Sequence, residues 1–303
     1  QVVRVACMAT CTAVLCRAAT QTAVWLSGRP TWDAPPTTAF RRMEEADGVV
    51  DVAATWDCLY VVVRGEVWAL GASNAYGQWG AGRDAPPGAW HRVRLPRGVC
   101  VRAMAGGVRH CLVAVDERGQ HVVYGWGQAR HGELRRVPPT PPYVWYTPVV
   151  VHAWPATHAS SLALGMHHTV IGAYARGETE LVAYGSNRRG QLDVPRGRRP
   201  GRWIPTCNWH TTLVWGDDVM EVYGARQHGQ GVGPGVPCRG AVQVSSGSEH
   251  SAMLRDGVVY GWGWDEHGSV GGGGAAVGAP RVLASEAEGV WTGYGTTWVK
   301  LRA

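Results

Sequence analysis

The chain has 303 residues, 45% of them hydrophobic and 17% charged, with a formal net charge of +6. This composition is typical of a folded globular protein and excludes a largely disordered chain. The longest apolar runs fall short of 18 residues, which excludes a membrane-spanning helix. Almost all of the positive charge is arginine, because Lys300 is the only lysine.

The positive charge permits several kinds of partner without selecting one. Apart from the cluster Arg196, Arg198, Arg199 and Arg202, no basic run is longer than a pair. Nucleic-acid binding is therefore permitted but not indicated. An acidic protein partner or a solvated basic face explains the charge equally well.

Eight cysteines are scattered along the chain without a Cys-x-x-Cys pair. Several lie in apolar, strand-like runs such as RHCLVAV. We expect buried thiols in a reducing compartment rather than a disulfide framework or a zinc site.

An internal repeat dominates the sequence. An aromatic-glycine strand recurs at 66–80, 122–134, 181–192, 221–231 and 258–271, with a fainter copy, AVWLSG, ending at Gly28. A second element precedes each copy, as in AGGVRHCLVAV (105–115) and SSGSEHSAML (245–254), and a last one ends the chain at 292–301. Six paired units of about four short strands, with one unpaired half, indicate β-propeller blades. The absence of a 3.6-residue apolar period excludes a helical solenoid.

Alternation explains the aromatic-glycine strand. In VVYGWG, Tyr260 and Trp262 share one face of the strand while Gly261 and Gly263 share the other. Large rings facing bare backbone let neighbouring sheets approach closely.

Two turn motifs accompany the strands. In the Asn/Asp-x-x-Gly turns that start at Asn74, Asn187 and Asp265, we expect the side chain to cap the turn and glycine to take a positive φ. In the Gly-x-x-His turns that end at His110, His168 and His250, we expect the imidazole to tie one strand to the next blade.

Two segments depart from the repeat. The proline-rich stretch 135–158 is expected to be a functional loop or an extended connection between blades. The glycine-rich stretch 271–276 is expected to be a flexible loop without a phosphate-binding role.

Enzymatic motifs are absent from the sequence. No Walker, HExxH, GxSxG or protein-kinase pattern occurs, and the Gly-x-Gly of the repeat precedes no helix. His167 and His168 could ligate a metal, but adjacent strand residues point to opposite faces. We therefore predict a protein that is not an enzyme and has no catalytic residues, metal or cofactor.

The paired signature G-x-x-H-[ST]…V-Y-x-W-G-x-N-x-x-G-x-L resembles the regulator of chromosome condensation repeat family over essentially the whole chain. The resemblance implies an all-β, seven-bladed β-propeller in a single domain, 1–303, with cytoplasmic and nuclear localisation. The segments SSGSEH, VYGWGWDEHG, GYGTTWVKL and CNWHTTLVW resemble a fungal subgroup known for alpha-tubulin suppression and killer-toxin insensitivity.

This finer resemblance implies a monomeric propeller in a heterodimer with a small, acidic, zinc-containing protein of diphthamide biosynthesis. That partner donates electrons and is shared with Elongator, which links it to tRNA wobble-uridine modification. The partner-binding residues predicted here are Trp264, Glu266, His267 and His250, with Trp298 beside them. Trp262 and Trp298 are equally explained as packing residues.

Two alternatives stay open. The founding member of the family is a guanine-nucleotide exchange factor for the small GTPase Ran, which it opens with a β-hairpin wedge. The stretch 135–158 lacks two alternating strands, and its prolines oppose a hairpin. The other alternative is a chromatin or trafficking scaffold.

The two ends of the chain predict an incomplete ring. The sequence both begins and ends with a His-turn half, so blade seven is expected to lack its aromatic-glycine strands. The family resemblance places these strands in an N-terminal segment that precedes Gln1.

Overall fold

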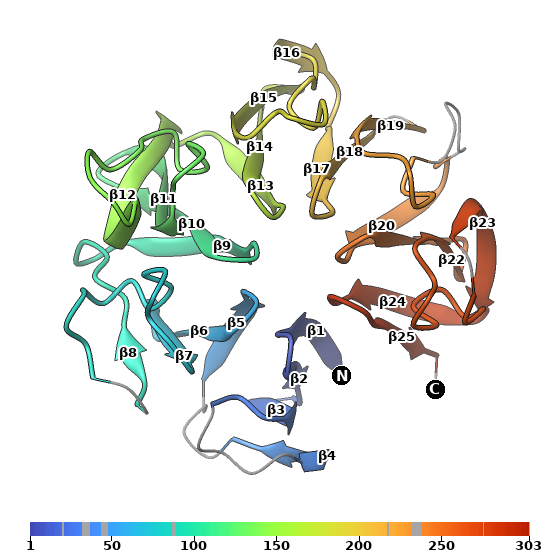
Figure 1. The fold of residues 1–303 in the computed structure, drawn as a ribbon, viewed down its shortest axis with the longest axis horizontal. Helices are drawn as coiled ribbons and strands as arrows, with labels where there is room; N and C mark the ends of the chain where they lie inside the picture. The colour runs from blue at the N-terminus through green and yellow to red at the C-terminus, as the bar shows by residue number, and fades with distance from the viewer. Residues whose placement is uncertain are drawn as a thin grey trace. The chain divides into compact units, whose positions relative to one another are not determined.

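The computed structural model describes residues 1–19, 21–31, 37–43, 48–86, 89–216, 218–231, 238–274 and 276–302. In these ranges all regular structure is β-strand (Figure 1). The described residues hold no helix with the length and apolar character that crossing a membrane requires. The chain forms two compact units, Gln1–His158 and Ala159–Ala303, which we call unit 1 and unit 2.

Unit 1 contains three four-stranded antiparallel sheets that follow one another in chain order (Figure 1). Their strands are β1 (Val2–Cys7), β2 (Cys11–Arg17), β3 (Thr22–Gly28) and β4 (Thr37–Arg42); β5 (Val49–Ala54), β6 (Cys58–Val63), β7 (Glu66–Gly71) and β8 (His91–Arg92); and β9 (Cys100–Gly106), β10 (His110–Glu117), β11 (Gln120–Gln128) and β12 (Val144–Pro155).

Unit 2 contains two sheets of four strands, one of three and one of two. Their strands are β13 (Ala159–Leu164), β14 (His168–Ala175), β15 (Glu178–Gly185) and β16 (Gly197–Pro200); β17 (Ile204–Cys207), β18 (Thr211–Gly216) and β19 (Val219–Gly224); β20 (Ala241–Ser246), β21 (His250–Arg255), β22 (Val258–Gly263) and β23 (Val277–Ala284); and β24 (Ala287–Thr292) with β25 (Thr297–Leu301).

The predicted pairing of halves is confirmed within the sheets. Strands β9 and β10 come from a His-turn half and join β11 of the following aromatic-glycine half. The unpaired last half forms the two-stranded sheet β24–β25. The described residues therefore form six sheets of blade size and one small sheet, and the prediction of seven blades is not confirmed.

The prediction for the proline-rich stretch 135–158 is wrong for its second half. Residues Val144–Pro155 form β12, the longest described strand, which pairs with β11. Pro148 lies where the register shifts between Gly125 and Gly127, and β12 is the edge strand of its sheet. Proline is tolerated there because an edge strand or a bulge does not need its amide as a donor.

The main core of unit 1 lies between the second and third sheets. Trp126 and Tyr60 are fully buried there, with ring centroids 5.8 Å apart. Both donate to the carbonyl oxygen of Gln78, Trp126 Nε1 at 2.8 Å and Tyr60 Oη at 2.6 Å. The indole of Trp126 therefore packs between the two sheets with its N–H hydrogen-bonded.

Each sheet carries the same turn between its first and second strands. The amide of the first turn residue donates to the carbonyl of the fourth, over distances of 2.8 to 2.9 Å. The seven donors are Met8, Thr55, Gly107, Gly165, Asn208, Gly247 and Gly293.

The second residue of the turn links neighbouring sheets through the backbone. In unit 1 the amide of Ala9 donates to the carbonyl of Trp56 at 2.8 Å, and the amide of Trp56 donates to Val108 at 3.0 Å. In unit 2 the amide of Met166 donates to the carbonyl of Trp209 at 3.0 Å, and the amide of Trp209 donates to that of Ser248 at 2.8 Å. We call these bonds between the second turn residues of adjacent sheets the relay bonds. These bonds hold adjacent sheets together without requiring any particular side chain.

The Gly-x-x-His motif ties sheets together through its side chain, as predicted. His168 Nε2 lies 3.1 Å from Thr212 Oγ1 of the next sheet. A Cβ on Gly165 would lie 2.1 Å from His168 Cε1, so the glycine makes room for the ring. The Asn/Asp-x-x-Gly prediction is also confirmed, because Asn187 Oδ1 caps the amide of Leu192 and Gly190 has a φ of +83°.

The glycine that ends each aromatic-glycine strand packs on the carbonyl of the third turn residue. A Cβ on Gly127, which has a φ of +103°, would lie 2.4 Å from the carbonyl oxygen of Arg109. The next amide, that of Gln128, donates to this same oxygen at 2.9 Å. The contact recurs between Gly28, Gly71, Gly185, Gly224 and Gly263 and the turns of their sheets.

We predict that Gly127→Ala destabilises the protein by at least about 3 kcal/mol, because the new Cβ meets backbone and the φ is unsuited to an L residue. Urea denaturation measures the free energy of unfolding. Gly278→Ala is the matched control: its Cβ meets nothing within 4 Å, so its effect should stay within about 0.5 kcal/mol. Equal losses in both variants would contradict the packing role of Gly127.

Candidate functional site

The candidate site lies at the end of the unit 1 sheets that carries these turns. The turn of each sheet and the loop after its third strand meet there, because the glycine contact joins them. Between them is a hollow of about 240 Å³ that we call the turn hollow. Its lining includes Thr10, Arg29, Trp56, Asp57, Tyr76 and Arg109.

Asp57 is a half-buried carboxylate in the wall of the turn hollow. Its carboxylate oxygens accept from Gln78 Nε2 at 2.9 and 3.0 Å. Burial raises the pKa of Asp57, while the Gln78 hydrogen bond and the charge of Arg109 oppose that rise. The hydrogen bonds fix the carboxylate in the wall of the hollow.

Arg109 presents a guanidinium group to the hollow and Trp56 an indole ring. The guanidinium of Arg109 lies 3.9 Å from the ring centroid of Tyr76, a cation–π contact. Trp56 is 40% exposed, and its backbone is fixed by the relay bonds to both neighbouring sheets. A half-exposed indole on a rigid turn beside a guanidinium is typical of an interface anchor.

The residues predicted from the sequence lie in unit 2, and the structure brings three of them together. The rings of Trp264 and His267 pack edge to face with centroids 4.7 Å apart. Glu266 is exposed between them in the chain. The amide of Trp264 donates to the carbonyl of Glu249 at 2.9 Å, which holds this turn against its own sheet. Glu266 and His267 are exposed and Trp264 is half-buried, and these three residues stay a predicted contact.

His250 lies next to this turn in the sheet, because its backbone pairs with Gly263, but its side chain is not exposed there. The side chain is fully buried, and its Nε2 donates to the carbonyl of Thr296 in the neighbouring sheet at 3.3 Å. A Cβ on Gly247 would lie 2.5 Å from its ring, so the ring is enclosed by its own turn. His250 therefore ties two sheets together, as His168 does. Of the two Trp residues, Trp262 is fully buried and Trp298 half-buried.

The sequence analysis missed Trp56, Asp57 and Arg109. They occupy the second and third positions of the repeated turn, where the copies of the repeat differ most in residue type. Comparing those positions across the copies would have found them. Their convergence on one hollow could not have been found, because it depends on contacts between sheets.

Comparisons with known proteins agree with this architecture. Residues 241–269 match the family described as Regulator of chromosome condensation (RCC1) repeat. The chain is 29% identical to the ultraviolet-B receptor UVR8 of Arabidopsis thaliana over 215 residues, 71% of this chain and 40% of that protein. It is 27% identical to the secretion-regulating guanine nucleotide exchange factor of Bos taurus over 288 residues, 78% of this chain and 60% of that protein.

Solved structures show the same fold over the whole chain. Human WBSCR16 superposes with a TM-score of 0.77 at 18% identity, covering 100% of this chain and 88% of that one. Prp20p of Saccharomyces cerevisiae, described with its binding to Gsp1p and histones, also gives 0.77, at 17% identity, covering 99% and 83%. The chain is thus an RCC1-like β-propeller, and the resemblance to the RCC1 repeat family is confirmed. It spans less than two thirds of the length of each of the two sequence relatives.

Burial of His250 predicts an acid-sensitive fold. Desolvation lowers the pKa of His250 to about 4 from its ordinary value of 6.5. The unfolded chain therefore binds a proton that the folded chain excludes, and stability is full above pH 6.5 and falls as the pH drops towards 4. We expect this histidine to account for a loss of about 2 kcal/mol at pH 5.

Urea denaturation at pH 7 and pH 5 tests this. In His250→Gln, which cannot titrate, the stability difference between the two pH values should shrink by that amount. An unchanged difference would contradict the prediction.

Proposed function

We propose that the chain is a non-enzymatic interaction module that binds a small GTPase through the turn hollow and promotes nucleotide exchange. The observation that carries this proposal is the similarity to the bovine secretion-regulating guanine nucleotide exchange factor over 288 residues. The turn hollow supports it physically, because Trp56 offers an apolar anchor and Arg109 a charge that an acidic partner surface complements.

We also propose that the protein forms the seven-bladed ring that the family resemblance implies. Buried thiols such as Cys58 and Cys207, whose pKa values burial raises, suit a reducing compartment. We accordingly propose cytoplasmic and nuclear localisation.

A second candidate partner is the acidic zinc-containing protein of diphthamide biosynthesis, shared with Elongator. The formal net charge of +6 favours an acidic partner in general. The bovine relative is named as an exchange factor, so the GTPase ranks first and this candidate second. Trp264, Glu266 and His267 are its proposed contact.

Release of a fluorescent GDP analogue from a panel of small GTPases that includes Ran tests the exchange function. The full chain should accelerate release from one GTPase well above background. Trp56→Ala should reduce that acceleration at least about 30-fold, because a buried aromatic anchor contributes 2 kcal/mol or more.

Trp25→Ala is the matched control, since Trp25 is 36% exposed and lies outside the hollow. Its effect should stay within about twofold. Release at the background rate from every GTPase would overturn the exchange proposal. Co-purification with the acidic zinc protein, lost in Trp264→Ala, would favour the second candidate.

A further inference from the structure

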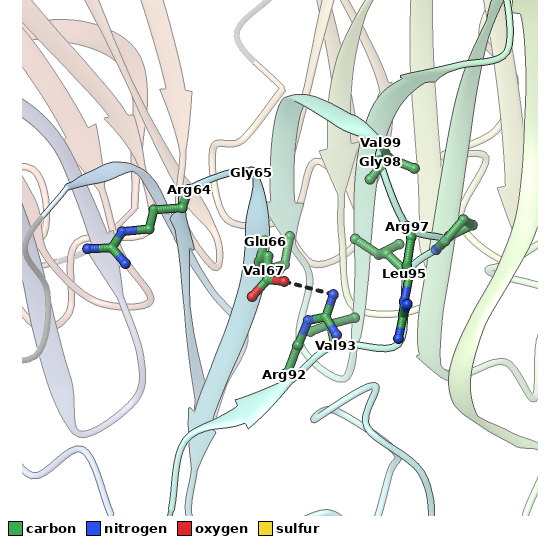
Figure 2. A pocket seen from close by; sticks show the side chains of 11 residues that line it. Arg64, Gly65, Glu66, Val67, Arg92, Val93, Leu95, Arg97, Gly98 and Val99 are labelled. Carbon is green, nitrogen blue, oxygen red and sulfur yellow. Dashed lines mark ion pairs between the residues drawn. The ribbon is translucent and has the colours of Figure 1, made fainter.

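A second hollow lies at the other end of the β5–β8 sheet. It has a volume of about 460 Å³ and is formed by the hairpin turn Arg64–Gly65, the strand β8 and the segment 95–99 (Figure 2). We call it the basic hollow. The turn hollow contains Trp56 and Asp57, which precede β6, whereas the basic hollow contains Arg64, which follows β6. The two hollows therefore lie at opposite ends of one strand.

Arginine dominates the charge of the basic hollow. Arg64, Arg92 and Arg97 line it, and Glu66 is the only carboxylate among its lining residues. Figure 2 shows Arg92 between Glu66 and Arg97, while Arg64 is on the far side of the β7 strand and points away. The charge of the hollow therefore rests on Arg92 and Arg97.

The one ion pair in the hollow is easily exchanged. Arg92 Nη2 lies 2.7 Å from Glu66 Oε1, and both side chains are 40% exposed or more. Exposed pairs of this kind contribute little, so an incoming carboxylate can compete for Arg92. Among the residues that the structure describes, Arg97 forms no ion pair and stays available to the same ligand.

The lining of the hollow is mixed, with a smaller apolar part. Val67 and Val93 belong to the core between the second and third sheets and expose almost no surface. Leu95 and Val99 pack against the same core and stay partly exposed. The hollow therefore offers a small aliphatic surface beside two guanidinium groups, and its volume is in the range of ligand-binding clefts.

The geometry points to an acidic peptide segment as the ligand: we propose that the basic hollow binds a partner's short segment with an apolar side chain between carboxylates. The apolar side chain covers the exposed parts of Leu95 and Val99, and the carboxylates pair with Arg92 and Arg97. A single-stranded nucleic acid fits less well, because no aromatic ring lines the hollow for bases to stack on. The hollow is also much larger than one inorganic anion needs.

Fluorescence anisotropy of a labelled pentapeptide, Glu-Asp-Leu-Asp-Glu, with the full chain at low ionic strength tests this proposal. We expect saturable binding that weakens with added salt. Arg97→Gln should weaken binding about tenfold, the loss of one charge-assisted hydrogen bond. Glu66→Gln should strengthen binding several-fold, because it releases Arg92; a purely structural role for Glu66 would not produce that gain.

The controls separate this site from general attraction. Arg94→Gln removes a charge from the same segment but outside the hollow, and its effect should stay within about twofold. Trp56→Ala should leave peptide binding unchanged, so failure of the proposed exchange function is distinguishable from failure here. Equal binding of the neutral peptide Gln-Asn-Leu-Asn-Gln, equal loss in Arg94→Gln, displacement by oligothymidine, or no binding below about 1 mM would each overturn the proposal.

Discussion

In each sheet of three or more strands, the first three strands are held together at one end by the carbonyl oxygen of the third turn residue. At Arg109 this oxygen accepts the amide of Gln128 and lies against the bare Cα of Gly127. One backbone atom thus fixes where the first turn of a sheet meets the end of its third strand. Because the loop that follows starts from this point, the loop and the turn always share one end of the sheet. The proposed binding surface, the turn hollow, lies at this end of the sheets because the glycine–carbonyl contact brings turn and loop together there.

The links between sheets at the turns are made largely by backbone, which leaves the side chains there open to variation. The relay bonds of unit 1 join Ala9, Trp56 and Val108, three residues with nothing chemical in common. A scaffold held by amides and carbonyls accepts any side chain at this position without loss of its hydrogen bonds. A repeated fold can therefore have Trp56 in the turn of one sheet and other residues in the turns of its neighbours. The backbone atoms of the turn stabilise the fold, and its side chains are available for recognition.

Sequence reasoning succeeded where the determinants are local and failed where they are not. The alternation of Tyr260 with glycine and the capping by Asn187 follow from neighbours in the chain, and both are confirmed. His250 was predicted both to tie one strand to the next blade and to contact a partner. Its full burial and its hydrogen bond to Thr296 in the neighbouring sheet show the first role, and the second needs an exposed side chain that it does not have. The strand β12 was not predicted, because its prolines indicate a loop while its valines favour a strand. The strand forms because it pairs with β11, and that pairing is not visible in the local sequence. The turn hollow needs three sheets and has no local signature.

The two hollows of unit 1 differ in chemistry because they lie at different ends of the β6 strand. Six residues at about 3.3 Å each separate them by roughly 20 Å. The core between them, with Tyr60 and Val62 buried, is closely packed. Occupation of one hollow should therefore leave the other open and unchanged in affinity. With both proposed ligands bound, the sheet would hold two partners at once and raise the local concentration of each for the other. The proposed exchange activity and a scaffold role would then use different ends of the same sheet.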